Sequence, residues 1–600
     1  MKTQKYSVNQ HLIETVLAWV KSGEIAIPEI QRPFVWDATK VRDLMDSLYQ
    51  GYPVGYIIAW RNPNVKLKDG SQSAGKKILI DGQQRVTALT AAILGQPVVN
   101  QDYRKVKIKI AFNPMDENGK FEVFNTAIAK DSVWIPDISE IFSSSVDLYD
   151  FVEDYCKRNP NAVNREIFKK FDHLKKIISK QIGLIELDSD LDIETVTEIF
   201  IRINSKGVAL SQADFAMSKI SVNEQYNGPI LRKCIDYFCH LAIAPEFWTQ
   251  IKETDHDFAA SPYFHKISWM SKEKDDLYDP DYTDLLRVAF TSQFNRGKLA
   301  DLVSLLSGRN FETRTYEDEI AKQSFEKLEQ GIVSFVNENN FKSFIMIIKS
   351  AGFISPDLIR SKNAINFAYI LYLKLKRLGH NPADIESYVR RWFVMSILTG
   401  RYSGSPESSF DYDIRQIASR PFKEVIEAEE AGRLSSAFWE VTLVQQLETS
   451  VASSPYFNVF LAAQVKGADK GFLSKDITVA DMINHKGDIH HIFPRDYLKK
   501  NGLSKIQYNQ IANYVYMQSE INIKVGNKPP SQYLREVEQQ CTTGMLKYGG
   551  IQDRNELLAN LETSCVPPDI MTMSLQDYPD FLKQRRILMA KKIQKYYFNL

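Results

Sequence analysis

Two adjacent histidines near the carboxyl end of the chain have the residue types and spacing of a hydrolytic site. They are His490 and His491 in the stretch GDIHHIFPRDYL, with Asp488 two positions before the pair and Pro494 three positions after it. Adjacent side chains of a regular strand point to opposite faces, so both can serve one site only where the strand kinks or ends. The proline indicates such an end. One imidazole could then bind a metal ion while the other acts as general base toward water.

A cation and a base are the two elements that hydrolysis of a phosphodiester requires. The cation neutralises charge that builds on the phosphate oxygens, and a base with a pKa near neutrality activates water. A metal held by one ligand would be loosely bound, so further ligands are expected downstream. Asn513 and Asn522 stand nine residues apart in NQIANYVYMQSEINIKVGNKPPSQYL. The combined pattern favours a site over two surface histidines that are adjacent by chance.

This pattern resembles the HNH, or ββα-metal, nucleases. The resemblance implies that His490 is a metal ligand and that His491 is the general base. It implies that Asn522 is the second protein ligand and that Asn513 holds the backbone around the base. Asp488 would orient a neighbouring group rather than bind the metal.

The chain departs from the HNH pattern at one position. The usual third ligand falls on Gly526, which has no side chain to bind a metal. Waters and DNA phosphate would then complete an oxygen-rich shell, which suits Mg²⁺ or another divalent cation better than Zn²⁺.

A second candidate site lies in KKILIDGQQRVTAL. A strand-like run ends in Asp81 and Gly82 and enters a helix whose first turn holds Gln83, Gln84 and Arg85. Free backbone N–H groups at a helix N-terminus, the helix dipole and a guanidinium together can bind phosphate. Taken alone, Asp-Gly before a helix is more often only a turn.

Two further stretches carry polar residues in loop-like surroundings. IPEIQRPFVWD places Gln31 and Arg32 between prolines, and IFIRINSKGVALSQADFAMSKI carries Arg202 and Asn204 before a helix start that Ser211 would cap. The structural alternatives are a packed loop for the first stretch and an ordinary capped helix for the second.

Together the three stretches resemble the N-terminal domain of the GmrSD family of type IV, modification-dependent restriction endonucleases, which is similar to the ParB/sulfiredoxin fold. The HHIFP to NKPPSQY segment is similar to the HNH domain of the same family, and residues 390–414 resemble a stretch that precedes it. The resemblance implies an endonuclease that attacks modified foreign DNA, usually phage DNA, with nucleoside triphosphate binding or hydrolysis. It also implies that DGQQR contacts the nucleotide and that Gln31, Arg32, Arg202 and Asn204 line the same pocket.

The length of 600 residues and the changes in residue pattern along the chain predict several domains. Over residues 1–225, strand-like runs rich in β-branched residues (53–60, 76–80, 105–112 and 182–187) mix with helical patterns, two of which end in Gly51 and Gly95. Amphipathic helical patterns dominate residues 226–440, and helices flank the histidine pair in residues 441–600. With the resemblance, we expect a multidomain α+β protein. It would comprise a ParB/sulfiredoxin-like α/β N-terminal domain for nucleotide binding and sensing, a mainly helical middle domain, and a C-terminal ββα-metal (HNH) nuclease domain embedded in helices.

Composition narrows the class of protein further. The net charge of +1 neither demands nor excludes nucleic acid, since binding needs only a local basic face. Five scattered cysteines predict free thiols in a reducing cytoplasm, and no signal peptide or membrane span is expected. The terminal FLKQRRILMAKKIQKYYFNL could bind phosphates or be a solvated basic helix.

The expected function is a cytoplasmic endonuclease that depends on a divalent metal and a nucleotide and acts on double-stranded DNA, with a homodimer as one assembly to consider. One rival is a nucleotide-gated DNA-binding protein with a degenerate nuclease domain. Gly526 favours this rival, while intact His490, His491, Asn513 and Asn522 oppose it. The other rival is a toxin-like nuclease that acts on host nucleic acid.

Overall fold

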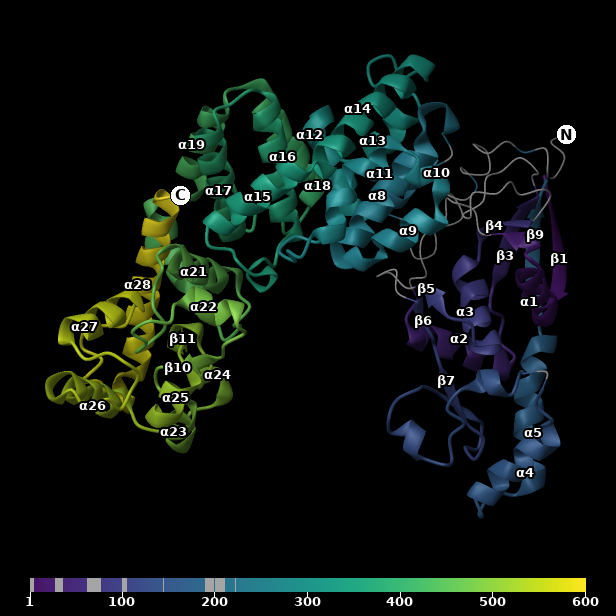
Figure 1. The fold of residues 1–600 in the computed structure, drawn as a ribbon, viewed down its shortest axis with the longest axis horizontal. Coiled ribbons are helices and arrows are strands. Elements are labelled where there is room, and N and C mark those ends of the chain that lie inside the picture. The colour runs from purple at the N-terminus through teal and green to yellow at the C-terminus, as the bar shows by residue number, and fades with distance from the viewer. Residues whose placement is uncertain are drawn as a thin grey trace. The chain divides into compact units, whose positions relative to one another are not determined.

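The computed structural model describes most of the chain in two compact units, Met1–His265 and Lys266–Leu600 (Figure 1). The described residues are 5–26, 36–61, 77–99, 105–143, 145–188, 191, 199, 211–221 and 223–600. Both units mix helices with small sheets, so the protein is of the α+β class. The finer division at residues 225 and 440 stays a prediction.

The first unit contains a mixed five-stranded sheet in the order β1-β9-β3-β4-β2. The outer pair β1 and β9 is antiparallel, β9 and β3 are parallel, β3 and β4 are antiparallel, and β4 and β2 are parallel. Three of these strands, β3, β4 and β9, coincide with segments whose β-branched residues predicted strands. The bounds are β1 Tyr6–Leu12, β2 Ile25–Ala26, β3 Tyr56–Arg61, β4 Lys77–Asp81 and β9 Gln181–Leu187.

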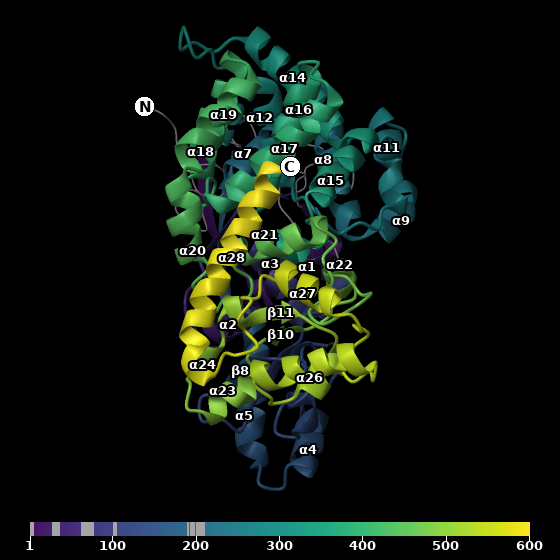
Figure 2. The same cartoon turned by 90° about the vertical axis from the view of Figure 1, so that its left-hand side faces the viewer.

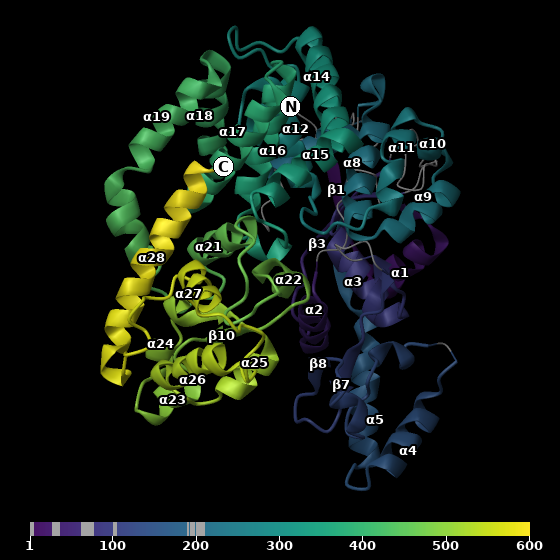
Figure 3. The same ribbon diagram turned by 60° about the vertical axis from the view of Figure 1, so that its left-hand side comes forward.

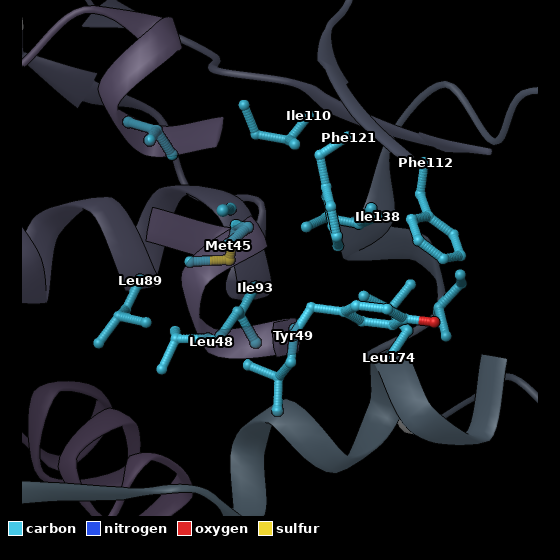
Figure 4. Packing of buried hydrophobic residues seen from close by; sticks show 14 of the residues in the cluster. Met45, Leu48, Tyr49, Leu89, Ile93, Ile110, Phe112, Phe121, Ile138 and Leu174 are labelled. Atoms are coloured by element: carbon cyan, nitrogen blue, oxygen red, sulfur yellow. The ribbon is translucent and has the colours of Figure 1, made fainter. Parts of the chain in front are cut away.

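Helices α1 (Ile13–Ser22), α2 (Ala38–Gln50) and α3 (Gln83–Leu94) contribute side chains to the cores of the first unit. The glycines predicted to end α2 and α3 do so in the left-handed conformation, with φ of 79° at Gly51 and 62° at Gly95. Figure 4 shows residues of α2 and α3, such as Met45 and Ile93, packed with Phe112 and Leu174.

The rest of the first unit consists of two short hairpins and further helices. β5 (Val98–Val99) pairs with β6 (Lys105–Val106), and β7 (Ile110–Asn113) pairs with β8 (Lys120–Val123). The helices are α4 Leu148–Arg158, α5 Asn164–Lys175, α7 Gln212–Ser221, α8 Gly228–Ile243, α9 Trp248–Thr254, α10 His256–Ala259 and α11 Pro262–Lys266.

The second unit begins with the packed helices predicted for the middle of the chain. α12 packs against α14 and α16, and α16 packs against α17. The bounds are α12 Tyr282–Phe294, α13 Leu299–Leu306, α14 Asp318–Val336, α15 Glu338–Ser350, α16 Lys362–Arg377, α17 Pro382–Leu398, α18 Pro406–Ser419, α19 Phe422–Arg433, α20 Leu443–Gln446, α21 Pro455–Lys466 and α22 Val479–Asn484.

A buried hydrogen-bond network joins Trp392, Arg401, Tyr402 and Asp413 of the 390–414 stretch to Glu429. Arg401 donates through Nε to Asp413 Oδ2 at 2.8 Å and through Nη1 to Glu429 Oε2 at 2.6 Å. Tyr402 donates its hydroxyl to the same Asp413 oxygen at 2.8 Å and accepts from Trp392 Nε1 at 2.9 Å. These groups satisfy one another, so the network joins α17, α18 and α19.

The remaining elements surround the histidine pair. β10 (Ile489–His491) and β11 (Tyr514–Tyr516) form an antiparallel hairpin, and α28 (Tyr578–Phe598) runs along the second unit (Figure 3). The other helices here are α23 Arg495–Lys500, α24 Lys505–Tyr508, α25 Ser519–Val525, α26 Pro530–Thr543 and α27 Arg554–Thr563. Among the described residues, every helix is too short or too polar to span a bilayer.

Candidate nuclease and nucleotide sites

The histidine pair lies on a strand that ends where the sequence predicted. β10 stops at His491, and Pro494 precedes the first turn of α23. The register sets His490 opposite Val515 and His491 opposite Tyr514 on β11. Figure 2 shows the two strands side by side. The helix α25 follows β11 directly in the chain, while α23 and α24 lie between β10 and β11.

The backbone after His491 is fixed at four consecutive points. The N–H of Ile492 donates to the Asn513 carbonyl at 2.9 Å, and its carbonyl accepts from the Tyr533 hydroxyl at 2.9 Å. The N–H of Phe493 donates to Asn513 Oδ1 at 2.8 Å, and its carbonyl accepts from Asn513 Nδ2 at 3.0 Å. Asn513 and Tyr533 are both buried, so water does not compete for these bonds.

The imidazole of His491 is hydrogen-bonded to a residue that the sequence analysis did not single out. Its Nε2 lies 3.0 Å from Oδ1 of Asn509, and its ring meets the Tyr514 ring edge-on with centroids 5.0 Å apart. Burial lowers the pKa of His491 below its ordinary value, as do the nearby charges of Arg495 and His490, while the bond to Asn509 acts in the opposite direction. The ring therefore favours the neutral form that a general base needs.

The imidazole of His490 differs from that of His491 in its hydrogen bonding. Its Nε2 is buried and has no hydrogen-bond partner among the described residues. Burial lowers the pKa of His490, and the carboxylate of Asp488 offsets part of that effect. A buried neutral imidazole nitrogen without a partner is costly unless another group uses it, and this donor fits a divalent cation.

The other predicted ligand, Asn522, lies half-buried on α25, while Asp488 is exposed just before β10. Gly526 ends α25 with φ of 57°, a conformation that favours glycine over a ligating side chain. Within the described ranges, no three side chains among His, Cys, Asp and Glu gather to bind a metal. A site here would thus use one imidazole and one amide, and its ligand roles stay predictions.

The DGQQR segment forms a tight turn between β4 and α3. Gly82 has φ of 90°, and a Cβ at this position would lie 3.2 Å from Ile57 Cα. Arg85 folds back so that Nη1 donates to the Tyr56 carbonyl, and Nη2 lies 4.0 Å from Asp81 Oδ2. These contacts bring the turn close to the start of β3.

Gln83 occupies the first position of α3 and is 6% exposed. Its Oε1 is buried without a hydrogen-bond partner among the described residues. Gln84, the next residue, is half-buried in the same first turn. An unpaired buried amide oxygen fits a site whose ligand donates a hydrogen bond to it.

The sequence of this region matches a known domain. Residues 13–221 match the family described as GmrSD restriction endonuclease, N-terminal domain. This part of the chain is similar to the N-terminal domain of the GmrSD family. Most of the chain is also similar to an uncharacterised protein, MJ0686, of Methanocaldococcus jannaschii, with 22% identity over 577 residues that cover 89% of this chain and 88% of that protein.

Four residues predicted for the nucleotide pocket of the GmrSD domain lie outside the described residues. They are Gln31, Arg32, Arg202 and Asn204. The helix start predicted downstream of them is confirmed, because Ser211 and Asp214 exchange the hydrogen bonds of a capping box: Ser211 N donates to Asp214 Oδ2 at 2.9 Å, and Asp214 N donates to Ser211 Oγ at 3.2 Å.

Outside residues 13–221, the terminal basic helix contributes a buried residue whose structural role the sequence did not predict. Arg585 of α28 is fully buried and donates through Nη1 to the carbonyls of Ala512 and Tyr514, both at 2.9 Å. Burial lowers its pKa to about 10. Arg585 lies four residues after Phe581 and four before Met589, both of which are buried on the same face of α28. This spacing in the sequence indicates that Arg585 also faces the core.

Proposed function

We propose that this protein is an endonuclease that requires a divalent metal and a nucleotide and restricts modified foreign DNA. Support comes from the GmrSD match over residues 13–221, a family described as restriction endonucleases, and from the hairpin that carries His490 and His491. In this proposal the substrate is double-stranded, modified DNA of phage origin.

One observation carries the nuclease half of the proposal. Two adjacent histidines end a strand whose following backbone is locked by Asn513 and Tyr533. One ring has its Nε2 bonded to Asn509, and the other has a buried Nε2 with no partner among the described residues. This difference matches the two roles, base and metal ligand, that phosphodiester hydrolysis needs.

In the proposed reaction, His491 accepts a proton from the attacking water. His490 and Asn522 would bind Mg²⁺ or another divalent cation, which supplies positive charge to the scissile phosphate when it is bound. Asn513 keeps the backbone of Phe493 fixed, so the imidazole of His491 keeps its place relative to the phosphate. Burial lowers the pKa of His491 and so favours the neutral form that can accept the proton.

The nucleotide half of the proposal places the triphosphate at the turn between β4 and α3. Asp81, Gly82, Gln83, Gln84 and Arg85 would contact it. The close backbone approach at Gly82 supports this contact, whereas the unsatisfied Oε1 of Gln83 would accept a hydrogen bond from the sugar or base of the nucleotide rather than contact a phosphate. The side chain of Arg85 is about three-quarters buried and is already hydrogen-bonded to Tyr56. Arg85 would therefore attract the phosphates by its positive charge without changing its conformation.

A cleavage panel tests the proposal. Phage DNAs of one sequence that differ only in modification are incubated with the protein, with and without Mg²⁺ and with each nucleoside triphosphate. The proposal expects cleavage of at least one modified DNA, sparing of its unmodified counterpart, and loss of cleavage when Mg²⁺ is removed. Equal cutting of modified and unmodified DNA would contradict restriction and support the toxin-like nuclease.

A second candidate function is a nucleotide-gated DNA-binding protein with a degenerate nuclease domain. The observation that favours it is Gly526, where α25 ends without the third ligand of the HNH pattern. Nucleotide-dependent DNA binding with no cleavage of any DNA in the panel would establish this alternative.

A further inference from the structure

We propose that Asn509 is a positioning residue that fixes the imidazole of His491 in a single tautomer and orientation, with Nδ1 as the base atom. This inference deepens the proposed nuclease function and rests on it for its catalytic meaning. The hydrogen bond between Asn509 Oδ1 and His491 Nε2, at 3.0 Å, does not depend on the proposed function.

The chemistry of the pair assigns the proton. An amide oxygen only accepts hydrogen bonds, so Nε2 of a neutral His491 carries the hydrogen and the free lone pair lies on Nδ1. Nδ1 has no hydrogen-bond partner among the described residues, and it is not fully buried. The atom left for a water molecule is therefore Nδ1.

Asn509 can perform this role because its own loop is held in place. It follows α24, whose start is fixed by a capping box between Ser504 and Gln507, and its N–H donates to the Lys505 carbonyl at 3.0 Å. The hydroxyl of Tyr578 on α28 donates to the Gln507 carbonyl at 3.1 Å. These bonds hold the backbone that carries the Asn509 side chain in place beside the imidazole.

The same loop also supplies Asn513, four residues later. Asn513 fixes the backbone of Phe493 and donates through Nδ2 to the Tyr508 carbonyl at 3.4 Å, next to Asn509. One segment thus controls both the backbone that carries His491 and the ring itself. Without Asn509, the Tyr514 ring would still limit where the imidazole lies, but nothing among the described residues would select the tautomer.

Two variants of similar size separate positioning from packing. Asn509→Leu removes the acceptor, and Asn509→Asp keeps an oxygen acceptor in the same place. Asn555→Leu, on the exposed face of α27, is the matched control. All are made in the full-length chain, and their folding is compared by circular dichroism.

The first measurement does not depend on activity. Nitrogen-15 NMR of selectively labelled histidines at alkaline pH, with the His491 signal assigned by its loss in His491→Ala, reports which ring nitrogen carries the proton. We expect the Nε2–H tautomer in the parental protein, in Asn509→Asp and in Asn555→Leu, and a mixture of tautomers in Asn509→Leu. An Nδ1–H tautomer in the parental protein, or an unchanged signal in Asn509→Leu, would overturn the inference.

The second measurement is the rate of DNA nicking. We expect kcat to fall about 10- to 100-fold in Asn509→Leu with unchanged DNA affinity, and to recover most of the way in Asn509→Asp. Parental kcat in Asn509→Leu, or no recovery in Asn509→Asp, would also overturn the inference. If the parental protein cuts no DNA, the proposed function fails, while the NMR result still decides whether Asn509 sets the tautomer.

Discussion

Asn513 binds both backbone groups of Phe493, accepting its N–H at 2.8 Å and donating to its carbonyl at 3.0 Å. Phe493 lies two residues beyond His491, and the same asparagine also binds the intervening Ile492 through its own carbonyl. A side-chain amide thereby replaces a strand partner just where β10 ends. The position of the candidate base therefore depends on a buried residue 22 positions later in the chain.

Replacing this asparagine should loosen the hairpin. Asn513→Ala leaves the N–H and carbonyl of Phe493 buried without partners, at a cost of about 2–4 kcal/mol. Hydrogen exchange of the segment around residues 489–493 should speed up accordingly, while Asn555→Ala should leave it unchanged. Undiminished protection in Asn513→Ala would show that the amide does not hold this backbone.

The buried network of the 390–414 stretch makes a prediction about stability. Asp413→Ala leaves the guanidinium of Arg401 buried with one of its two carboxylates missing, which should cost about 3–5 kcal/mol. Denaturant unfolding followed by tryptophan fluorescence measures the loss, because Trp392 lies against Arg401.

The matched control is Glu427→Ala on α19, whose partner Lys423 is exposed. This surface pair should contribute no more than about 1 kcal/mol. Equal unfolding midpoints for Asp413→Ala and Glu427→Ala would mean that the network adds nothing beyond a surface ion pair.

The buried His240 of α8 should make the stability of the first unit depend on pH. Burial lowers its pKa from 6.5 to about 4, so between these values the unfolded chain takes up a proton that the folded chain refuses. Stability should therefore fall as the pH drops from 6.5 toward 4. His240→Leu should flatten this part of the curve by about 1 kcal/mol per pH unit, whereas the exposed His256→Leu should not. Parallel curves for His240→Leu and the parental protein would contradict the assignment.

The nucleotide site can be tested at Arg85. Arg85→Ala removes the charge beside the first turn of α3 and should weaken triphosphate binding by about 10-fold or more in isothermal titration. Arg158→Ala, at the exposed end of α4, is the control for loss of a charge elsewhere in the first unit. Unchanged affinity in a folded Arg85→Ala protein would remove this arginine from the pocket.

Local patterns were enough to predict much of the fold. β-branched runs marked β3, β4 and β9, terminal glycines marked the ends of α2 and α3, and Pro494 marked the end of β10. These features depend on neighbours within a few residues, where backbone preferences and side-chain spacing act directly.

The residues that surround His491 were harder to predict, because their partners are distant in the sequence. Asn509 lies 18 positions from His491, Tyr533 lies 41 positions from Ile492, and Arg585 lies 73 positions from Ala512. Arg585 donates to backbone carbonyls, and the sequence has no acid three or four residues from it that would indicate an ion pair. Asparagine in a loop is too common a turn residue to indicate a contact with an imidazole.

The central claim is that His491 takes the proton from the attacking water. Its most direct measurement is the nicking rate of His491→Ala on a modified DNA that the parental protein cuts, beside His485→Ala, which removes an exposed imidazole six residues earlier. The account predicts a loss of about 100-fold or more in His491→Ala, with DNA and nucleotide binding retained, and parental cleavage in His485→Ala. Cleavage by His491→Ala at the parental rate would contradict it.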